Sequence, residues 1–227
     1  MDKKVKGNVE RLLYDNYRVR TSGKSQALNI YQNNNGGFEG GRQHDPIYND
    51  ENVRRQIYTF GCSWTYGWGV EQTETFTHLL GDENTAVHNY GAGGTGLDFA
   101  VKTLSEVYIP QSRRQIFIIT VPHYFRRTWF DDDGVVLRAW QVKELVNINE
   151  YNNYYHFLHQ YNILNSFVGK NKIIWGTWDK DLPDEHFDIF FERIDHTDDG
   201  LHPGPKSHKQ YADKLKEIIK ERYESNG

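Results

Sequence analysis

The stretch QIYTFGCSWTYG, residues 56–67, joins an apolar run to a serine that lies between two glycines. The run IYTFG (57–61) is typical of a buried strand. Glycine adds nothing to the interior of such a strand, because it has no side chain to pack and costs conformational entropy. Glycines do suit a strand that ends in a tight turn. The stretch therefore predicts a core strand that carries Ser63 at its carboxyl end.

Short apolar runs alternate with helical patterns along the rest of the chain. We predict further strands over residues 86–91, 115–122, 172–178 and within FDIFF (187–191). Helices are predicted from Thr73 to Leu80, after a capping pair of Thr95 and Asp98, over 141–168 with a break near Asn152, and from Pro205 onward. The charged segment RRTWFDDDG (126–134) is expected to be a loop. This alternation predicts a three-layer α/β/α sandwich with a mostly parallel sheet.

Composition limits the classes of function. A chain of 227 residues fits one main domain, which we place at 56–227, with a polar extension (1–55) packing on it. The net charge of −4 provides no basic surface for nucleic acid or an anionic membrane. The single cysteine excludes an internal disulfide and cysteine-rich zinc sites. The amino terminus lacks a signal-peptide core and no run reaches membrane-spanning length, so we expect a cytoplasmic protein; its oligomeric state stays open.

Three polar or glycine-rich clusters are predicted to meet at one edge of the sheet. They are residues 61–67, 89–96 and 198–204, each placed after a predicted strand or just before the last helix. Ligands of parallel α/β sheets bind beyond the carboxyl ends of the strands. A serine hydroxyl becomes a nucleophile when a base takes its proton and a carboxylate orients that base. Asp199 and His202 could supply both groups from a single turn.

Together these clusters resemble the motifs of the GDSL/SGNH hydrolases, which are serine esterases and lipases with a flavodoxin-like sandwich. The pattern G-D-S-x-T-x-G matches residues 61–67 except that Cys62 replaces the aspartate. The pattern N-x-G-x-x-G matches residues 89–94, and D-x-x-H-P matches residues 199–203. The three matches occur in the family's order.

The resemblance implies an esterase mechanism that needs no cofactor and no metal. Ser63 would be the nucleophile, His202 its base and Asp199 the residue that orients the base. The oxyanion would be held by the backbone N–H groups of Ser63 and Gly94. The family's G-x-N-D motif has no counterpart after strand 115–122, where His123 falls nearest the missing asparagine and is expected to donate an N–H instead.

The implied substrate is an ester of a small molecule or a carbohydrate, from which an acyl group is removed. Asn89, Trp64 and Tyr66 are predicted to contact this substrate. For Asn89 the alternative is a role in fixing the loop, and for the two aromatic residues it is packing around the turn.

Other interpretations of the same residues remain open at this point. Cys62 is an alternative nucleophile, because a thiolate is intrinsically more reactive than a hydroxyl. Glycines 91–96 could cradle a phosphate at the start of a helix, and the His/Asp segment 196–202 has the chemistry of a metal site. Arg126 and Arg127 suit a solvated surface or an acidic substrate group. A non-catalytic binding module, or acyl transfer to an acceptor other than water, is also compatible with these motifs.

Overall fold

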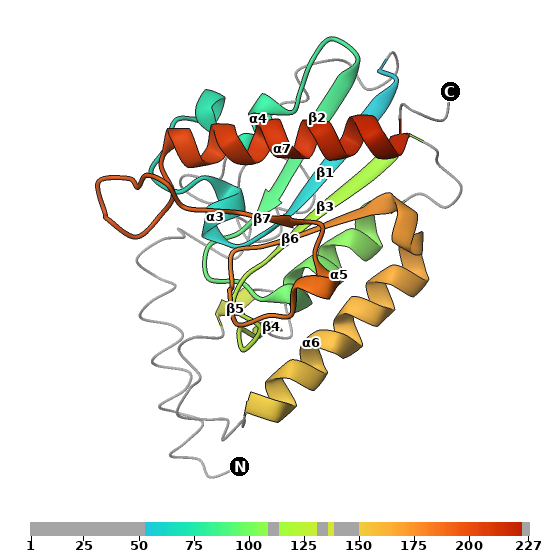
Figure 1. Cartoon of the computed structure of the whole chain (residues 1–227). Helices are drawn as coiled ribbons and strands as arrows, with labels where there is room; N and C mark the ends of the chain where they lie inside the picture. Colours follow the sequence, from blue (N-terminus) through green and yellow to red (C-terminus); the bar gives the residue numbers. More distant parts are fainter. Residues whose placement is uncertain (1–52, 109–113, 131–135, 139–149, 224–227) are drawn as a thin grey trace.

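The computed structural model of the protein describes residues 53–108, 114–130, 136–138 and 150–223 (Figure 1). Five parallel strands form a sheet in the order β2-β1-β3-β6-β7. Their bounds are β1 Arg55–Gly61, β2 Thr85–Gly91, β3 Gln115–Val121, β6 Ile173–Thr177 and β7 Ile189–Phe190. Each strand predicted from the sequence is therefore present. Most of the predicted extension, residues 1–52, lies outside the described residues.

Helices cover both faces of the sheet, as the predicted sandwich requires. On one side lie α4 (Phe76–Leu79) and α7 (Pro205–Tyr223), and on the other lie α5 (Leu97–Val107) and α6 (Glu150–Leu164) (Figure 1). The short elements are α3 Ser63–Tyr66, η1 Gln72–Glu74, η3 Asn165–Gly169, η4 Lys170–Lys172 and η5 Asp184–His186. None of the helices within the described ranges is both long enough and apolar enough to cross a membrane.

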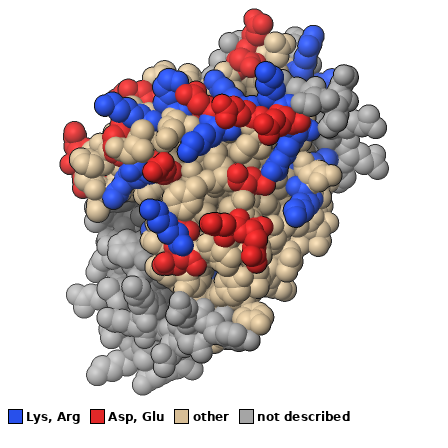
Figure 2. Space-filling view, viewed as in Figure 1, with Lys and Arg blue, Asp and Glu red and all other residues tan. Residues whose placement is uncertain are grey.

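Two hydrophobic cores result from this layering. β1 contributes to both, because successive side chains of a strand point to opposite faces. Ile57 packs with Phe76 and Tyr211 on the α7 side, whereas Phe60 packs with Leu104 on the α5 side. Outside the core, the exposed face of α7 carries interspersed acidic and basic side chains (Figure 2).

The strand order creates a switch point between β1 and β3. The chain leaves β1 for β2 on one side, and β3 pairs with the other side of β1. If the five strands of this sheet are numbered by their sequence order, their order across the sheet is 2-1-3-4-5, which is the flavodoxin-like order. In this type of sheet the ligand crevice lies beyond the carboxyl ends of strands 1 and 3. The fold therefore favours a binding site next to the residues that follow β1 and β3.

Two predicted helix caps were wrong. Thr75, not Thr73, caps α4, since its Oγ1 accepts the N–H of His78 at 3.2 Å and η1 occupies the preceding residues. The Thr95–Asp98 pair does not cap α5 either, because its N-cap is Gly96. The Thr95 hydroxyl instead donates to the Ala92 carbonyl at 2.7 Å, which fixes the glycine-rich loop before the helix.

The segment between β3 and β6 also differs from the prediction. α6 runs unbroken from Glu150 through Asn152, and the part of that helix predicted over 141–149 lies outside the described residues. Part of the predicted loop 126–134 is a strand, β4 (Thr128–Phe130), which pairs antiparallel with β5 (Val136–Arg138).

Candidate active site

Ser63 is the first residue of α3, directly after β1. α3 packs so tightly against the ends of β1 and β2 that positions 61 and 91 accept only glycine. A Cβ on Gly61 would lie 2.1 Å from a hydroxyl oxygen of α3, and a Cβ on Gly91 would lie 2.3 Å from the backbone nitrogen of Tyr66. These glycines therefore let a helical turn begin at the sheet edge, with the serine half-exposed at its start.

Ser63, His202 and Asp199 form a continuous hydrogen-bonded chain. Ser63 Oγ lies 2.9 Å from His202 Nε2, although the two residues are 139 positions apart in sequence. His202 Nδ1 lies 2.5 Å from Asp199 Oδ2. An ionised carboxylate only accepts, so Nδ1–H donates to Asp199 and the Nε2 lone pair faces the serine hydroxyl. This is the tautomer in which an imidazole can accept a proton from serine.

The Asp199 carboxylate also organises the turn that carries His202. Its Oδ1 accepts hydrogen bonds from the Leu201 N–H at 2.8 Å, the His202 N–H at 3.0 Å and the Thr197 hydroxyl at 2.7 Å. Burial raises the pKa of Asp199, but these N–H groups, the imidazole and the hydroxyl together lower it well below its usual range. Asp199 is consequently ionised at any pH at which an imidazole titrates.

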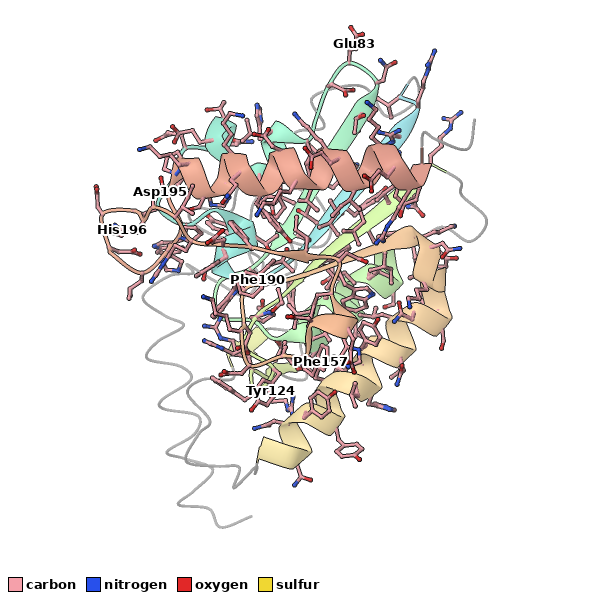
Figure 3. The ribbon with its side chains drawn as sticks, in the orientation of Figure 1. Glu83, Tyr124, Phe157, Phe190, Asp195 and His196 are labelled. Carbon is pink, nitrogen blue, oxygen red and sulfur yellow. The ribbon has the colours of Figure 1, made fainter. Side chains whose placement is uncertain are left out.

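This turn is anchored to the amino end of α7 through Asp195. The Asp195 carboxylate accepts the N–H groups of Lys206 at 2.9 Å and Ser207 at 2.8 Å, which are donors of the first turn of the helix. Asp195 and His196 lie in the loop that leads into α7 (Figure 3). The helix thus fixes where His202 meets the carboxyl end of β1.

The glycine-rich loop after β2 runs beside Ser63. A Cβ on Gly93 would lie 3.9 Å from the Ser63 Cβ, and Gly94 adopts a left-handed conformation at φ +77°. The loop is held at its far end by the Gly96 N–H, which donates to the Thr128 hydroxyl at 2.8 Å. Gly94 and Ser63, the two residues predicted to hold the oxyanion, line the same cavity.

A cavity of about 940 Å³ opens over these residues. Ser63, His202 and Asp199 line it together with three indole side chains, of Trp64, Trp68 and Trp178. Trp64 stacks on Trp178 with ring centroids 4.5 Å apart, so part of its surface is used in packing. Trp68 is 36% exposed and its ring centroid lies 6.1 Å from that of His202.

Two of the predicted substrate-binding residues are not among those that line the cavity. The amide of Asn89 is committed to the backbone: its Nδ2 donates to the Thr65 carbonyl at 3.0 Å and its Oδ1 accepts the Gly91 N–H at 2.8 Å. Asn89 therefore ties α3 to the end of β2, which is the loop-fixing alternative. Tyr66 packs with Trp68 at a centroid distance of 6.0 Å.

The structure bears on three of the other interpretations, which concern Cys62, the two arginines and a metal site. The Cys62 side chain is fully buried and does not line the cavity. Arg127 is buried, donating to the Asn153 side-chain oxygen at 3.0 Å, so it is not part of a solvated face; Arg126 lines the cavity. Across the described ranges, no group of three or more His, Cys, Asp or Glu side chains is placed to hold a metal ion.

Sequence reasoning missed several charged residues of the cavity wall, which are Asp179, Lys180, Asp181, Glu192 and Arg193. Asp179 follows β6, and its Oδ2 lies 3.2 Å from His123 Nδ1. The available signal was its position: a carboxylate directly after a parallel strand belongs to the same sheet edge as Ser63.

Comparison with known proteins gives likenesses of fold. No protein-family profile matches the chain, and no curated protein matches it in sequence. A carbohydrate esterase family 2 enzyme with a carbohydrate-binding domain, from Corynascus thermopiles (Myceliophthora fergusii), has a TM-score of 0.49 and 12% identity over 78% of this chain and 68% of that one. A member of the lipolytic protein G-D-S-L family from Veillonella parvula has a TM-score of 0.48 and 14% identity over 73% and 98%. A family two carbohydrate esterase from Clostridium thermocellum, in complex with cellohexaose, has a TM-score of 0.49 and 16% identity over 77% and 66%.

Proposed function

We propose that the protein is a serine hydrolase that cleaves carboxylic esters. The observation that carries this proposal is the chain from Ser63 through His202 to Asp199, with contacts of 2.9 and 2.5 Å, opening on a cavity of about 940 Å³. A serine hydroxyl bonded to a correctly oriented imidazole at a sheet switch point is an arrangement for acyl transfer.

In the proposed mechanism His202 Nε2 takes the Ser63 proton as Oγ bonds to the acyl carbon. The carbonyl electron pair moves to its oxygen, which accepts hydrogen bonds from the backbone N–H groups of Ser63 and Gly94. Asp199 stabilises the imidazolium that forms. His202 then returns the proton to the departing alcohol, which leaves an acyl group on Ser63. Water, deprotonated by His202, releases this group as the acid.

For the substrate we propose an O-acylated small molecule or carbohydrate. A cavity of this volume admits a small ester or a few sugar units, and the exposed indole of Trp68 offers an apolar surface next to the base. Acyl transfer to a sugar hydroxyl uses the same first step, and product analysis with added sugars distinguishes it from hydrolysis.

A fluorophosphonate probe tests the nucleophile directly, because it phosphonylates activated serines. We expect stoichiometric labelling of the wild type and of Ser105→Ala, in which an exposed serine of α5 is removed. Ser63→Ala should lose all labelling. Labelling that survives in Ser63→Ala would mean that another residue reacts and would contradict the assignment of the nucleophile. Absence of labelling from the wild type between about pH 6 and about pH 9 would favour a binding module over an enzyme.

A series of p-nitrophenyl esters, from acetyl to long-chain, tests the reaction beside acetylated xylan. We expect turnover of at least one of these esters by the wild type, and loss of this turnover in both Ser63→Ala and His202→Ala. Equal turnover by the wild type and the two variants would contradict it.

A further inference from the structure

Arg193 belongs to the loop that leads from β7 to α7, between Phe190 and Asp195 (Figure 3). It lines the cavity, and its Nη1 donates to the Leu201 carbonyl at 2.7 Å. Across the described ranges, no carboxylate lies within ion-pairing distance of this guanidinium. The cation is therefore directed to the turn that carries His202 rather than to a neighbouring acid.

This hydrogen bond falls on the peptide group that joins Leu201 to His202. The carbonyl of the group accepts from Arg193, and its N–H, which belongs to His202, donates to Asp199 Oδ1 at 3.0 Å. A cation at the carbonyl polarises the peptide group and strengthens the bond that its N–H donates to the carboxylate. The next peptide group is held as well, since the His202 carbonyl accepts the Thr197 N–H at 3.0 Å. Both peptide groups beside the Cα of His202 are thus fixed, which sets the direction in which its side chain leaves the backbone.

The backbone on either side of Arg193 is itself fixed. Before it, Phe191 is fully buried and stacks on Tyr211 with ring centroids 4.2 Å apart. After it, the Ile194 N–H donates to the Ser207 hydroxyl of α7 at 3.0 Å. The side chain of Arg193 is exposed, but it reaches the turn from a rigid base.

The same guanidinium also interacts with the segment that carries the nucleophile. Arg193 Cζ lies 6.0 Å from the centroid of the Trp64 ring, and Trp64 follows Ser63 in α3. A guanidinium within about 6 Å of an indole face is attracted to it. Arg193 therefore interacts with a neighbour of Ser63 and with a neighbour of His202, which are 139 positions apart.

We propose that Arg193 is a positioning residue that holds His202 in line with Ser63. This inference rests on the proposed function. Arg193 transfers no proton; it acts through the Leu201 carbonyl, which keeps His202 Nε2 at 2.9 Å from Ser63 Oγ. The alignment of reacting groups has a large effect on rate, because a misplacement of about 1 Å costs on the order of 100-fold.

The test compares kcat and KM of Arg193→Met with those of the wild type on a neutral p-nitrophenyl ester. Methionine keeps an apolar stem but has no donor for the carbonyl. We expect kcat to fall roughly 10- to 100-fold while KM changes by less than about threefold, because the lost contact aligns the base and does not bind the ester. Arg193→Lys keeps a cationic donor, so its kcat should exceed that of Arg193→Met by at least about threefold.

The matched control is Lys209→Met, which removes the same charge from an exposed position of α7 and should keep wild-type activity. The urea midpoint of Arg193→Met should stay close to that of the wild type, since the side chain is exposed. A kcat that falls only together with the urea midpoint, and that Arg193→Lys does not raise, would show a general structural role and overturn the inference.

An ester whose acyl group carries a carboxylate separates positioning from substrate binding. Both esters should lose the same factor in kcat, and the rate of fluorophosphonate labelling at Ser63 should fall with it. A rise in KM confined to the acidic ester would instead make Arg193 a substrate-binding residue and overturn the inference.

The outcome also distinguishes this inference from the proposed function. If Arg193→Met keeps more than about half of the wild-type kcat, the positioning role is wrong, while labelling of Ser63 in the wild type still supports the hydrolase. Absence of Ser63 labelling in the wild type would overturn the proposed function and this inference with it.

Discussion

Replacing Asp199 with asparagine would separate the two roles of this carboxylate. Oδ1 holds the turn through the N–H groups of Leu201 and His202, and Oδ2 sets the tautomer of His202 across 2.5 Å. Asparagine keeps an oxygen at the Oδ1 position but puts an NH₂ group against Nδ1. Nδ1 must then accept, which places the ring proton on Nε2, 2.9 Å from Ser63 Oγ.

A ring protonated at Nε2 cannot take the serine proton. In the serine-protease triad the same exchange costs about 10⁴-fold in kcat, on the order of 5.5 kcal/mol of transition-state stabilisation. We expect a loss on the order of 10³- to 10⁴-fold for Asp199→Asn. The free energy of unfolding should change by less than about 1 kcal/mol, because the side chain is a third exposed and its Oδ1 contacts remain.

The assay compares kcat/KM on a p-nitrophenyl ester with the urea midpoint of the same sample. Asp198→Asn, at the exposed neighbouring carboxylate, is the matched control and should retain its activity. Because the pKa of Asp199 is lowered, its stabilising effect is present above the ordinary carboxyl pKa of about 3.9 and lost as the pH falls below it. The acid limb of the wild-type profile of kcat/KM against pH, above about pH 5, should accordingly show one ionisation. If Asp199→Asn keeps more than about a tenth of wild-type activity, the tautomer argument is wrong.

Cys62→Ala should keep most of its activity and make no difference to inhibition by thiol reagents, since the sulfur is buried away from the cavity; a loss as large as that of a nucleophile variant would contradict the assignment. Leu104→Ala should lower the free energy of unfolding by about 2–5 kcal/mol, as for other fully buried leucines. The half-exposed Ile194→Ala should change it by less than about 0.5 kcal/mol in the same urea titration. Burial raises the pKa of Asp98, but hydrogen bonds from the His156 side chain and a backbone N–H lower it overall. Its contribution to stability is therefore present above about pH 3.9 and lost as the pH falls, and stability measured below that pH should depend less on pH in Asp98→Asn.

The strands could be predicted because a parallel sheet covered on both faces leaves continuous apolar runs in the sequence. β3 is the clearest case, since all seven of its residues are buried. The helix caps could not be assigned as reliably. Thr95 is a good capping residue by type, but its hydroxyl has a stronger competing use in the backbone of the preceding loop. Residue type was also a weak guide at Asn152, because an exposed asparagine is tolerated inside a helix that is packed elsewhere.

The contact of Ser63, His202 and Asp199 followed from motif spacing combined with the rule that strand ends share one edge. The environment of His123 could not be predicted in this way. Its partner Asp179 follows β6, and the two residues meet only because β3 and β6 are neighbours in the sheet. Spacing along the chain also gave no means to tell which aromatic side chains face the cavity. That distinction depends on stacking partners such as Trp178, which packs on Trp64.

The long separation between Ser63 and His202 has a consequence for biosynthesis. With 139 positions between them, and elongation at about 5–20 residues per second, the serine precedes its base on the ribosome by roughly 7–28 s. During this interval the nascent polypeptide carries a hydroxyl that nothing deprotonates. The proposed hydrolytic activity should then arise only late, when α7 packs on the sheet and His202 reaches Ser63. Nascent fragments released before this point would be inactive.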